Sequence, residues 1–229
     1  RMVRNDRVIW ASCMVSCGDA DGAVTGNTRR YGASLEKIQK VIDPRPGEIM
    51  FGLNMIVNKG KTVFVGDTSV HEYPSSEQLA EIAISSARVV RLFGFDPKVA
   101  FVSHSTFGQP LTSRTKHIKN AVDILKEKNV DFKFDGDMQP DVALNDQYKE
   151  LYPFSEIVGS SNVLIMPGQH SAAISYKMMR ELGGAKVIGP LLIGLSQPIE
   201  IAPLRSSTSD ILNLASVAAY SASVISYNK

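Results

Sequence analysis

The chain has 229 residues, 44% of them hydrophobic, and a formal net charge of +2 at pH 7. This length and composition support a buried core in one or two domains. The scattered Lys and Arg residues argue against a nucleic-acid partner, and no apolar run reaches the roughly 18 to 20 residues of a membrane helix. We therefore expect neither nucleic acid nor a membrane among the partners.

The first predicted elements alternate between helix and strand. Residues 8–17 favour a helix, and residues 21–26 favour a short strand that runs into a glycine turn. Residues 34–43 favour a second helix, which a proline stops. The apolar, β-branched segments 48–57 and 61–67 are typical of buried strands.

The clearest helix covers residues 74–94. Ser75 and Gln78 form a capping-box pattern, apolar residues recur on one face, and Gly94 ends the helix. Beyond it the pattern predicts a strand at 98–104, a helix at 112–129, strands at 130–136 and 162–167, a helix at 170–184, strands at 185–195 and 198–202, and a helix at 209–223. Strands that alternate with helices predict an α/β fold with mainly parallel sheets.

The sulfur-containing residues do not indicate a metal site. Cys13 and Cys17 stand at an i, i+4 spacing, which fits a disulfide poorly, and a metal would need further ligands nearby. We expect buried free thiols in a reducing cytosol, and hence a cytoplasmic protein. Met178, Met179 and Leu182 are interpreted as core filling on a helix face.

Four loops follow predicted strands, where ligands of parallel α/β folds bind. They cover residues 26–30, 103–108, 167–171 and 203–210. Most are rich in hydroxyl groups and glycine, two carry arginine, and none has the pattern of a P-loop or a dinucleotide turn. Together they predict a cleft for a phosphate-bearing ligand without a metal-centred site.

The last of these loops precedes the final helix. Ser206, Ser207, Thr208 and Ser209 are all residues that cap helices well, so the free N–H groups of this helix end suit an anion. Arg205 would add a bidentate donor. The alternative is that one hydroxyl caps the helix while the others face water.

The four histidines lack the spacing of a metal site, since His71, His104, His117 and His170 are spread along the chain. His104 follows a predicted strand, where it would serve as an acid or base in a cleft or fill a hydrogen-bonded structural role. Asp67 is interpreted as structural.

The segments DADGAVTG, residues 66–108, residues 162–199 and SDILNLA resemble the phosphate acetyl/butyryltransferase family through nearly the whole chain. Within that family, DGAVTGNTRRY, DTSVHEYPSSEQLA and AFVSHSTFGQP are most similar to the phosphotransacetylase-like domain at the C-terminus of bacterial NADP-dependent malic enzymes. The resemblance implies two α/β subdomains with a cleft between them, as in isocitrate and isopropylmalate dehydrogenases.

The implied first subdomain combines residues 1–72 with 191–229, and residues 73–190 form an inserted second one. The family's usual N-terminal portion is missing, and the chain begins within charged sequence at Arg1, so we expect a piece of a longer polypeptide. The family is dimeric, and the final helix is apolar on more than one face, which predicts a homodimer through that helix or its neighbours.

The resemblance also bears on chemistry. Active members carry a Ser–Arg pair in the last loop, and alignment on Asp210 and Ile211 puts Pro203 and Leu204 at the places of that pair. Arg205 lies one position after the place of the family's arginine. Glu36 lies near the place of another family arginine, where it would repel phosphate. We expect this loop to hold a ligand without reacting with it, and we assign no catalytic residue.

The resemblance thus implies a regulatory and dimerisation domain of malic enzyme that binds acetyl-CoA and lacks transferase activity. An active phosphate acetyl- or butyryltransferase is the alternative, and an oligomerisation module without a ligand is a third option. We expect no cofactor or metal in this domain, with NADP and a divalent metal in the malic-enzyme part. The candidate ligand-binding residues are Thr25, Gly26, Thr28, Arg29, Ser105, Thr106, Gly108, Arg205, Ser206 and Asp210.

Overall fold

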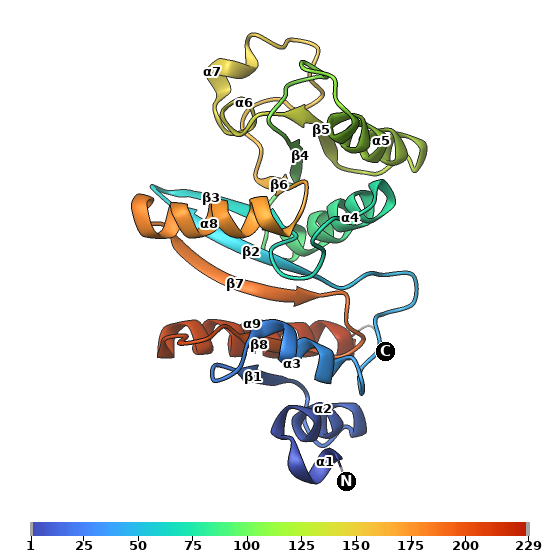
Figure 1. The fold of residues 1–229 in the computed structure, drawn as a ribbon, viewed down its shortest axis with the longest axis vertical. Helices are drawn as coiled ribbons and strands as arrows, with labels where there is room; N and C mark the ends of the chain where they lie inside the picture. The colour runs from blue at the N-terminus through green and yellow to red at the C-terminus, as the bar shows by residue number, and fades with distance from the viewer. Residues whose placement is uncertain (1, 228–229) are drawn as a thin grey trace. The chain divides into compact units, whose positions relative to one another are not determined.

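The computed structural model describes residues 2–227, and the chain divides into two compact units. The first unit combines Arg1–Asn54 with Ile188–Lys229, and the second is Met55–Val187 (Figure 1). The boundaries expected from the sequence, at residues 72/73 and 190/191, lie later in the chain. The difference arises because the strand at residues 61–66 pairs with the strand at 163–165 and so belongs to the second unit.

The first unit is built around two short parallel strands. β1 (Ala23–Gly26) pairs with β8 (Ile199–Ala202) in a register that sets Ala23 opposite Ile199. The helices of this unit are α1 (Met2–Asn5), α2 (Arg7–Cys17), α3 (Tyr31–Ile38) and α9 (Thr208–Tyr227). Its buried apolar side chains come from α2, α3, β8 and α9, and include Val8, Ile9, Val15, Leu35, Ile38, Ile199, Ile201, Leu214 and Ala218.

The remaining strands of the described residues form a six-stranded sheet in the order β5-β4-β6-β3-β2-β7. Their bounds are β2 (Phe51–Asn58), β3 (Lys61–Gly66), β4 (Lys98–Val102), β5 (Lys133–Met138), β6 (Val163–Ile165) and β7 (Lys186–Ile193). The pairs β3–β6, β4–β6 and β4–β5 are parallel. Lys59 and Gly60 turn β2 into β3 with φ angles of 49° and 77°, as a tight hairpin requires. The predicted α/β fold with mainly parallel pairing is confirmed.

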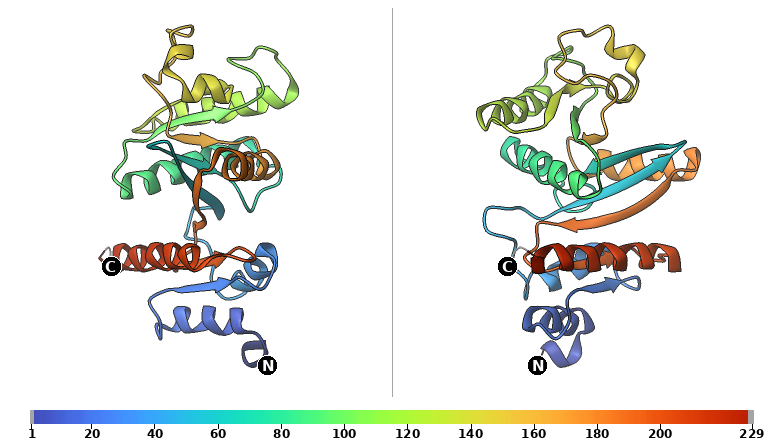
Figure 2. Two further views of the ribbon diagram at one scale, coloured as in Figure 1. Left: turned by 90° about the vertical axis from the view of Figure 1, so that its left-hand side faces the viewer. Right: turned by 180° about the vertical axis from the view of Figure 1, so that it is seen from behind.

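The helices of the second unit are α4 (Ser76–Leu92), α5 (Ser113–Glu127), α6 (Pro140–Leu144), α7 (Asp146–Lys149) and α8 (Gln169–Gly183). Figure 2 shows α4 and α8 on opposite sides of the strands between them. The predicted capping box of Ser75 and Gln78 is confirmed at the start of α4. The core of this unit lies under these helices and includes Val65, Ala100, Val102, Met138, Leu164, Met166 and Ala172.

Two expectations about side-chain burial were wrong. Cys13 and Cys17 are free thiols, but Cys13 is half-buried and Cys17 is exposed, because their face of α2 does not point into the core. On α8, Met179 packs against the core, whereas Met178 is 55% and Leu182 is 82% exposed. The core-facing side of α8 is therefore narrower than its apolar content indicates.

Among residues 2–227, no helix combines the length and apolar character that a membrane crossing requires.

Candidate ligand-binding sites

The parallel pairing of β1 and β8 brings the loops after both strands together in the first unit. The backbone N–H of Asn27 donates to the Ala202 carbonyl at 2.8 Å, and that of Arg205 donates to the Asn27 carbonyl at 3.3 Å. Gly26 has a φ of 101°, and a Cβ there would lie 2.4 Å from the Ala202 oxygen. Only glycine fits this close approach, so Gly26 fixes the loop geometry.

The loop before α9 uses most of its polar groups internally. Ser206 Oγ donates to the Pro203 carbonyl at 2.9 Å. Ser207 Oγ donates to Asp210 Oδ2 at 2.8 Å, and the Asp210 N–H donates back to Ser207 Oγ at 3.2 Å. This reciprocal cap matches the alternative in which a hydroxyl simply caps the helix. Arg205 is exposed, with φ at 62°, and its side chain makes no ion pair within residues 2–227.

The loop after β1 contains one arginine that is already paired. Arg29 donates to Asp6 Oδ2 at 2.8 Å, and Lys37 contacts the same oxygen. The hydrogen bond from Lys37, together with that from Arg29, holds the pKa of Asp6 well below its usual range. Thr25 is half-buried within β1, and Thr28 is exposed beyond it. Arg29 therefore anchors the loop to the start of α2.

The loop after β4 in the second unit is organised by Asp137. Ser105 is fully buried and its hydroxyl donates to the Asp137 carboxylate, while the Gly108 N–H donates to Asp137 Oδ1 at 3.0 Å. Thr106 Oγ1 accepts a hydrogen bond from the N–H of Gln139 at 3.2 Å. The polar groups of these predicted ligand-binding residues are thus engaged within the protein.

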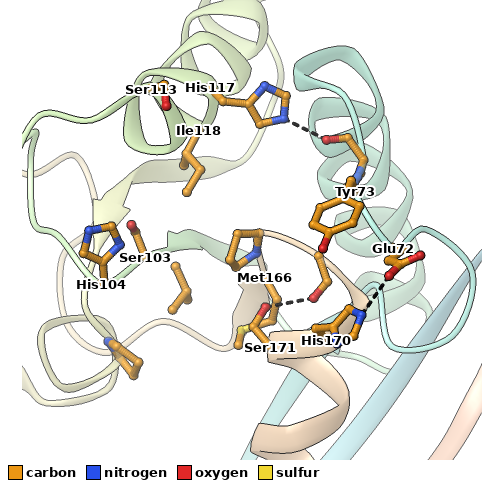
Figure 3. Close-up of a pocket in the computed structure, with 15 residues that line it drawn as sticks. Glu72, Tyr73, Ser103, His104, Ser113, His117, Ile118, Met166, His170 and Ser171 are labelled. Carbon is orange, nitrogen blue, oxygen red and sulfur yellow. Dashed lines mark hydrogen bonds and ion pairs between the residues drawn. The ribbon is translucent and has the colours of Figure 1, made fainter.

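A pocket of about 810 Å³ opens beside that loop, wholly within the second unit (Figure 3). Val102, Ile118 and Met166 supply apolar lining, together with Pro74, Pro140 and Pro167. The hydroxyl-bearing residues Ser103, Ser113 and Ser171 line it as well. The lining comes from the ends of β4 and β6, the first two turns of α5, the starts of α6 and α8, and the segment before α4. The two strand ends lie at the carboxyl edge of the parallel sheet, where ligands of such folds bind.

Three of the four histidines line this pocket, namely His104, His117 and His170. His117 bridges two groups, with Nε2 2.7 Å from the Pro74 carbonyl oxygen and Nδ1 3.0 Å from Ser76 Oγ. His170 Nε2 lies 2.9 Å from Glu72 Oε1, with both side chains exposed. His104 is exposed and makes no hydrogen bond to any residue of the described chain.

The sequence indicated a possible role for His104 but none for His117 or His170. The signal for His170 was its place in a loop after a strand, whereas His117 lies one turn inside α5, where sequence alone cannot show which way it points. His71 lies outside the pocket and contacts Asp67 at 2.8 Å. Asp67 is buried and also accepts from three backbone N–H groups, in agreement with a structural role.

No group of three or more His, Cys, Asp or Glu residues within the described part of the chain is arranged to hold a metal ion.

Comparisons with known proteins identify related chains. A family profile described as Phosphate acetyl/butaryl transferase matches residues 1–219. The NADP-dependent malic enzyme of Rhizobium meliloti (strain 1021) is 48% identical over 222 residues, which is 97% of this chain and 29% of that protein. The phosphate acetyltransferase of Nitratidesulfovibrio vulgaris is 32% identical, with 97% of this chain and 32% of that protein covered.

Solved structures agree with these relatives. A phosphotransacetylase from Streptococcus pyogenes superposes with a TM-score of 0.88 at 29% identity, and the match covers 93% of this chain and 66% of that one. The chain thus spans about 29% of the length of the malic enzymes that it matches.

Proposed function

The chain belongs to the phosphate acetyl/butaryl transferase family, and from this premise we propose that it is a regulatory domain that binds acetyl-CoA and does not transfer the acetyl group. The malic-enzyme relatives support the proposal that this chain is a domain of a longer enzyme, because the match covers only 29 or 30% of their own length. We propose that the whole protein is a cytoplasmic NADP-dependent malic enzyme. Its other domains would oxidise and decarboxylate malate with NADP and a divalent metal.

The loop before α9 carries the proposal that transfer is absent. Pro203 and Leu204 occupy the places where active members carry their Ser–Arg pair, and neither side chain donates a hydrogen bond. The nearest hydroxyl, on Ser206, is directed to the Pro203 carbonyl. Stabilisation of a developing charge is usually a large part of catalysis, so its loss is expected to abolish turnover while binding remains.

The groups that we propose for acetyl-CoA come from the loops of the first unit. Arg205 has an exposed guanidinium without an ion pair among the described residues, and Thr28 is exposed in the loop after β1. Thr25, Gly26, Arg29, Ser206 and Asp210 complete this set, with Arg29, Ser206 and Asp210 acting mainly through the loop geometry that they fix. We do not assign ligand contacts to Ser105, Thr106 and Gly108, whose groups are engaged near Asp137.

An active transferase stays the second candidate because of Arg205. Its unpaired guanidinium stands one position after Leu204, and Asp210 is retained from the active pattern. In that case Arg205 would bind phosphate and Ser206 would rotate toward the leaving thiolate.

Calorimetric titration with acetyl-CoA tests the binding proposal. We expect Arg205→Ala to weaken binding by about 1.5 to 3 kcal/mol, the range for a hydrogen bond to a charged group. Arg205→Lys should recover only part of the loss, since lysine keeps the charge without the bidentate geometry. Arg7→Ala is the matched control, because Arg7 is an exposed arginine of the same unit outside these loops. Unchanged binding in Arg205→Ala would remove these loops from the proposal.

We also propose that the protein forms a homodimer. Support comes from apolar side chains left exposed on two helices, namely Ile174, Met178 and Leu182 on α8 and Leu212 and Tyr220 on α9. Several exposed apolar side chains on one helix are typical of subunit contacts.

A further inference from the structure

The proposed acetyl-CoA site does not include the pocket of the second unit. This pocket nevertheless lies at a place in the sheet where ligands bind. β4 and β6 are neighbours, and the chain leaves them in opposite directions, from β4 through α5 to β5 and from β6 through α8 to β7. Open α/β sheets bind ligands beyond the carboxyl ends of strands at such switch points. Its volume of about 810 Å³ also falls within the range of small-molecule sites.

The interior of the pocket suits a flat, uncharged ring. Val102, Ile118 and Met166 form apolar walls that are 3%, 3% and 6% exposed. Side chains this well packed hold their shape, so the walls are preformed rather than adaptable. The prolines of the lining add rigid surfaces that lose no side-chain entropy on binding.

The polar groups of the lining suit the edge of a nitrogen heterocycle. The Ser113 hydroxyl and the two ring nitrogens of His104 can donate and accept hydrogen bonds. Ser103 Oγ lies 3.1 Å from Ser105 Oγ and accepts the Ser105 N–H at 3.3 Å, so with its proton toward Ser105 it offers a ligand an acceptor. A purine ring presents ring-nitrogen acceptors next to an exocyclic donor, and such mixed groups satisfy both. Figure 3 shows His104 beside Ser103 at one side of the pocket.

The opposite side of the pocket carries aromatic surface and free N–H groups. The rings of Tyr73 and His170 lie 6.3 Å apart at an interplanar angle of 27°, and both residues line the pocket. The backbone N–H groups of His170 and Ser171, in the first turn of α8, find no acceptor within residues 2–227. Aromatic faces stack on bases, and free N–H groups at a helix start accommodate a phosphate attached to the ligand.

We infer that this pocket binds the adenine ring of a nucleotide. The ring would lie between the apolar walls, with its edge toward Ser103 and His104 and its ribose phosphate toward the start of α8. Two kinds of ligand contain an adenine nucleotide: free adenine nucleotides, and acetyl-CoA at its nucleotide end. The inference does not depend on acetyl-CoA being the effector, and the ligands below separate the sources.

The test is calorimetric titration of the whole chain with AMP, adenosine 3′,5′-bisphosphate, acetyl-CoA and S-acetylpantetheine. Tyr73→Ala and His104→Ala are the test variants, because both side chains are exposed and their removal leaves the core intact. Tyr148→Ala is the matched control, an exposed tyrosine of the same unit outside the pocket. We expect at least one adenine ligand to bind about tenfold more weakly to each test variant and equally to the control.

Imidazole NMR supplies an independent readout, since the chain has 4 histidines. On addition of the adenine ligand that binds, the signals of His104 and His170 should shift most, and those of His71 least. If AMP binds in this way and acetyl-CoA does not compete with it, the source is a free nucleotide. If acetyl-CoA and adenosine 3′,5′-bisphosphate compete with each other for the pocket and AMP binds more weakly than either, the ligand is acetyl-CoA.

Two results would overturn the inference. One is wild-type affinity of both test variants for every adenine ligand. The other is a loss of affinity for S-acetylpantetheine without a loss for the nucleotides, which would give the pocket to the pantetheine arm. If acetyl-CoA fails to bind the wild type while AMP binds in the pocket, the effector proposal fails and this inference stands.

Discussion

Glu200 on β8 is the most strongly perturbed acid of the described residues. Burial raises the pKa of its carboxyl to about 8, although the Leu192 N–H that donates to Glu200 Oε2 at 2.9 Å opposes this shift. In the unfolded chain the same group titrates near 4.5. The folded protein therefore holds a proton on Glu200 over a range of pH in which the unfolded chain has released it.

This difference makes the stability of the first unit depend on pH. Because the folded state binds more protons between about pH 4.5 and 8, the free energy of unfolding should fall as pH rises, by about 1.4 kcal/mol per unit for this group. The contribution is complete below pH 4.5 and is lost as pH rises through 8. Glu200→Gln should flatten this slope and exceed the wild type in stability at pH 8.

Urea unfolding followed by Trp10 fluorescence measures this effect, since the single tryptophan lies on α2 in the same unit. Glu36→Gln is the control, because Glu36 is an exposed glutamate of that unit. Equal slopes in wild type and Glu200→Gln would show that Glu200 titrates normally.

Asp137 is the second residue for which we predict an effect of substitution on stability. Its buried carboxylate accepts from the Ser105 hydroxyl and the Gly108 N–H, so Asp137→Ala leaves two donors without a partner. We expect a loss of about 2 to 4 kcal/mol in the free energy of unfolding. Asp123→Ala on α5, where the side chain is 49% exposed, should change it by less than about 0.5 kcal/mol. A matched small effect at both sites would mean that the loop after β4 is held by other contacts.

The residues of the candidate sites were only partly predictable. Position after a strand suggested the loops at 26–30 and 203–210 as candidates, because ligands of parallel α/β folds bind beyond the carboxyl ends of the strands. It did not show that Ser105 is buried under Asp137, since that contact joins residues far apart in the sequence. His117 likewise turns toward Pro74 through a contact that no local pattern encodes.

At the scale of elements, long and capped helices were predictable and short ones were not. α4 shows both its capping box and its apolar periodicity in the sequence. The helices α6 and α7 have 5 and 4 residues, too few for a helical period to stand out. They depend instead on local caps, with Pro140 in the first turn of α6 and Asn145 accepting the N–H of Gln147 before α7.

The exposed face of α8 leads to a prediction about assembly. Ile174, Met178 and Leu182 recur at a four-residue spacing and form one apolar stripe, whereas α9 buries Leu214 on its inner face. We expect Met178→Glu to convert the proposed dimer to a monomer in light scattering at micromolar concentration. Leu212→Glu on α9 is the comparison variant. If only this change dissociates the dimer, the interface lies on α9. A monomeric wild type would contradict the dimer proposal.

At the scale of the whole molecule, the chain contains two units, each with parallel strands. The resemblance implied a discontinuous first subdomain, but its boundaries could not be read accurately from the sequence. The reason is that β2 and β7 are continuous strands that cross from one unit to the other, so no change in composition marks the crossing.

In the proposed function, a member of the phosphate acetyl/butaryl transferase family has Pro203 and Leu204 at the places where the resemblance puts the Ser–Arg pair. In a malic enzyme of the length of the relatives, Arg205→Ala should reduce the effect of acetyl-CoA on malate oxidation and leave the rate without acetyl-CoA nearly unchanged. The reason is that an effector acts only through its different affinity for two states of the protein. A variant that responds like the wild type would separate Arg205 from regulation.

The most direct measurement is calorimetric titration of acetyl-CoA into this chain in phosphate buffer, with free thiol assayed in the cell afterwards. We expect a saturable binding isotherm, a baseline that returns to zero after each injection, and no thiol above background. Sustained heat with accumulating thiol would contradict the absence of transferase activity, and the lack of any binding heat or competition would contradict acetyl-CoA as the ligand.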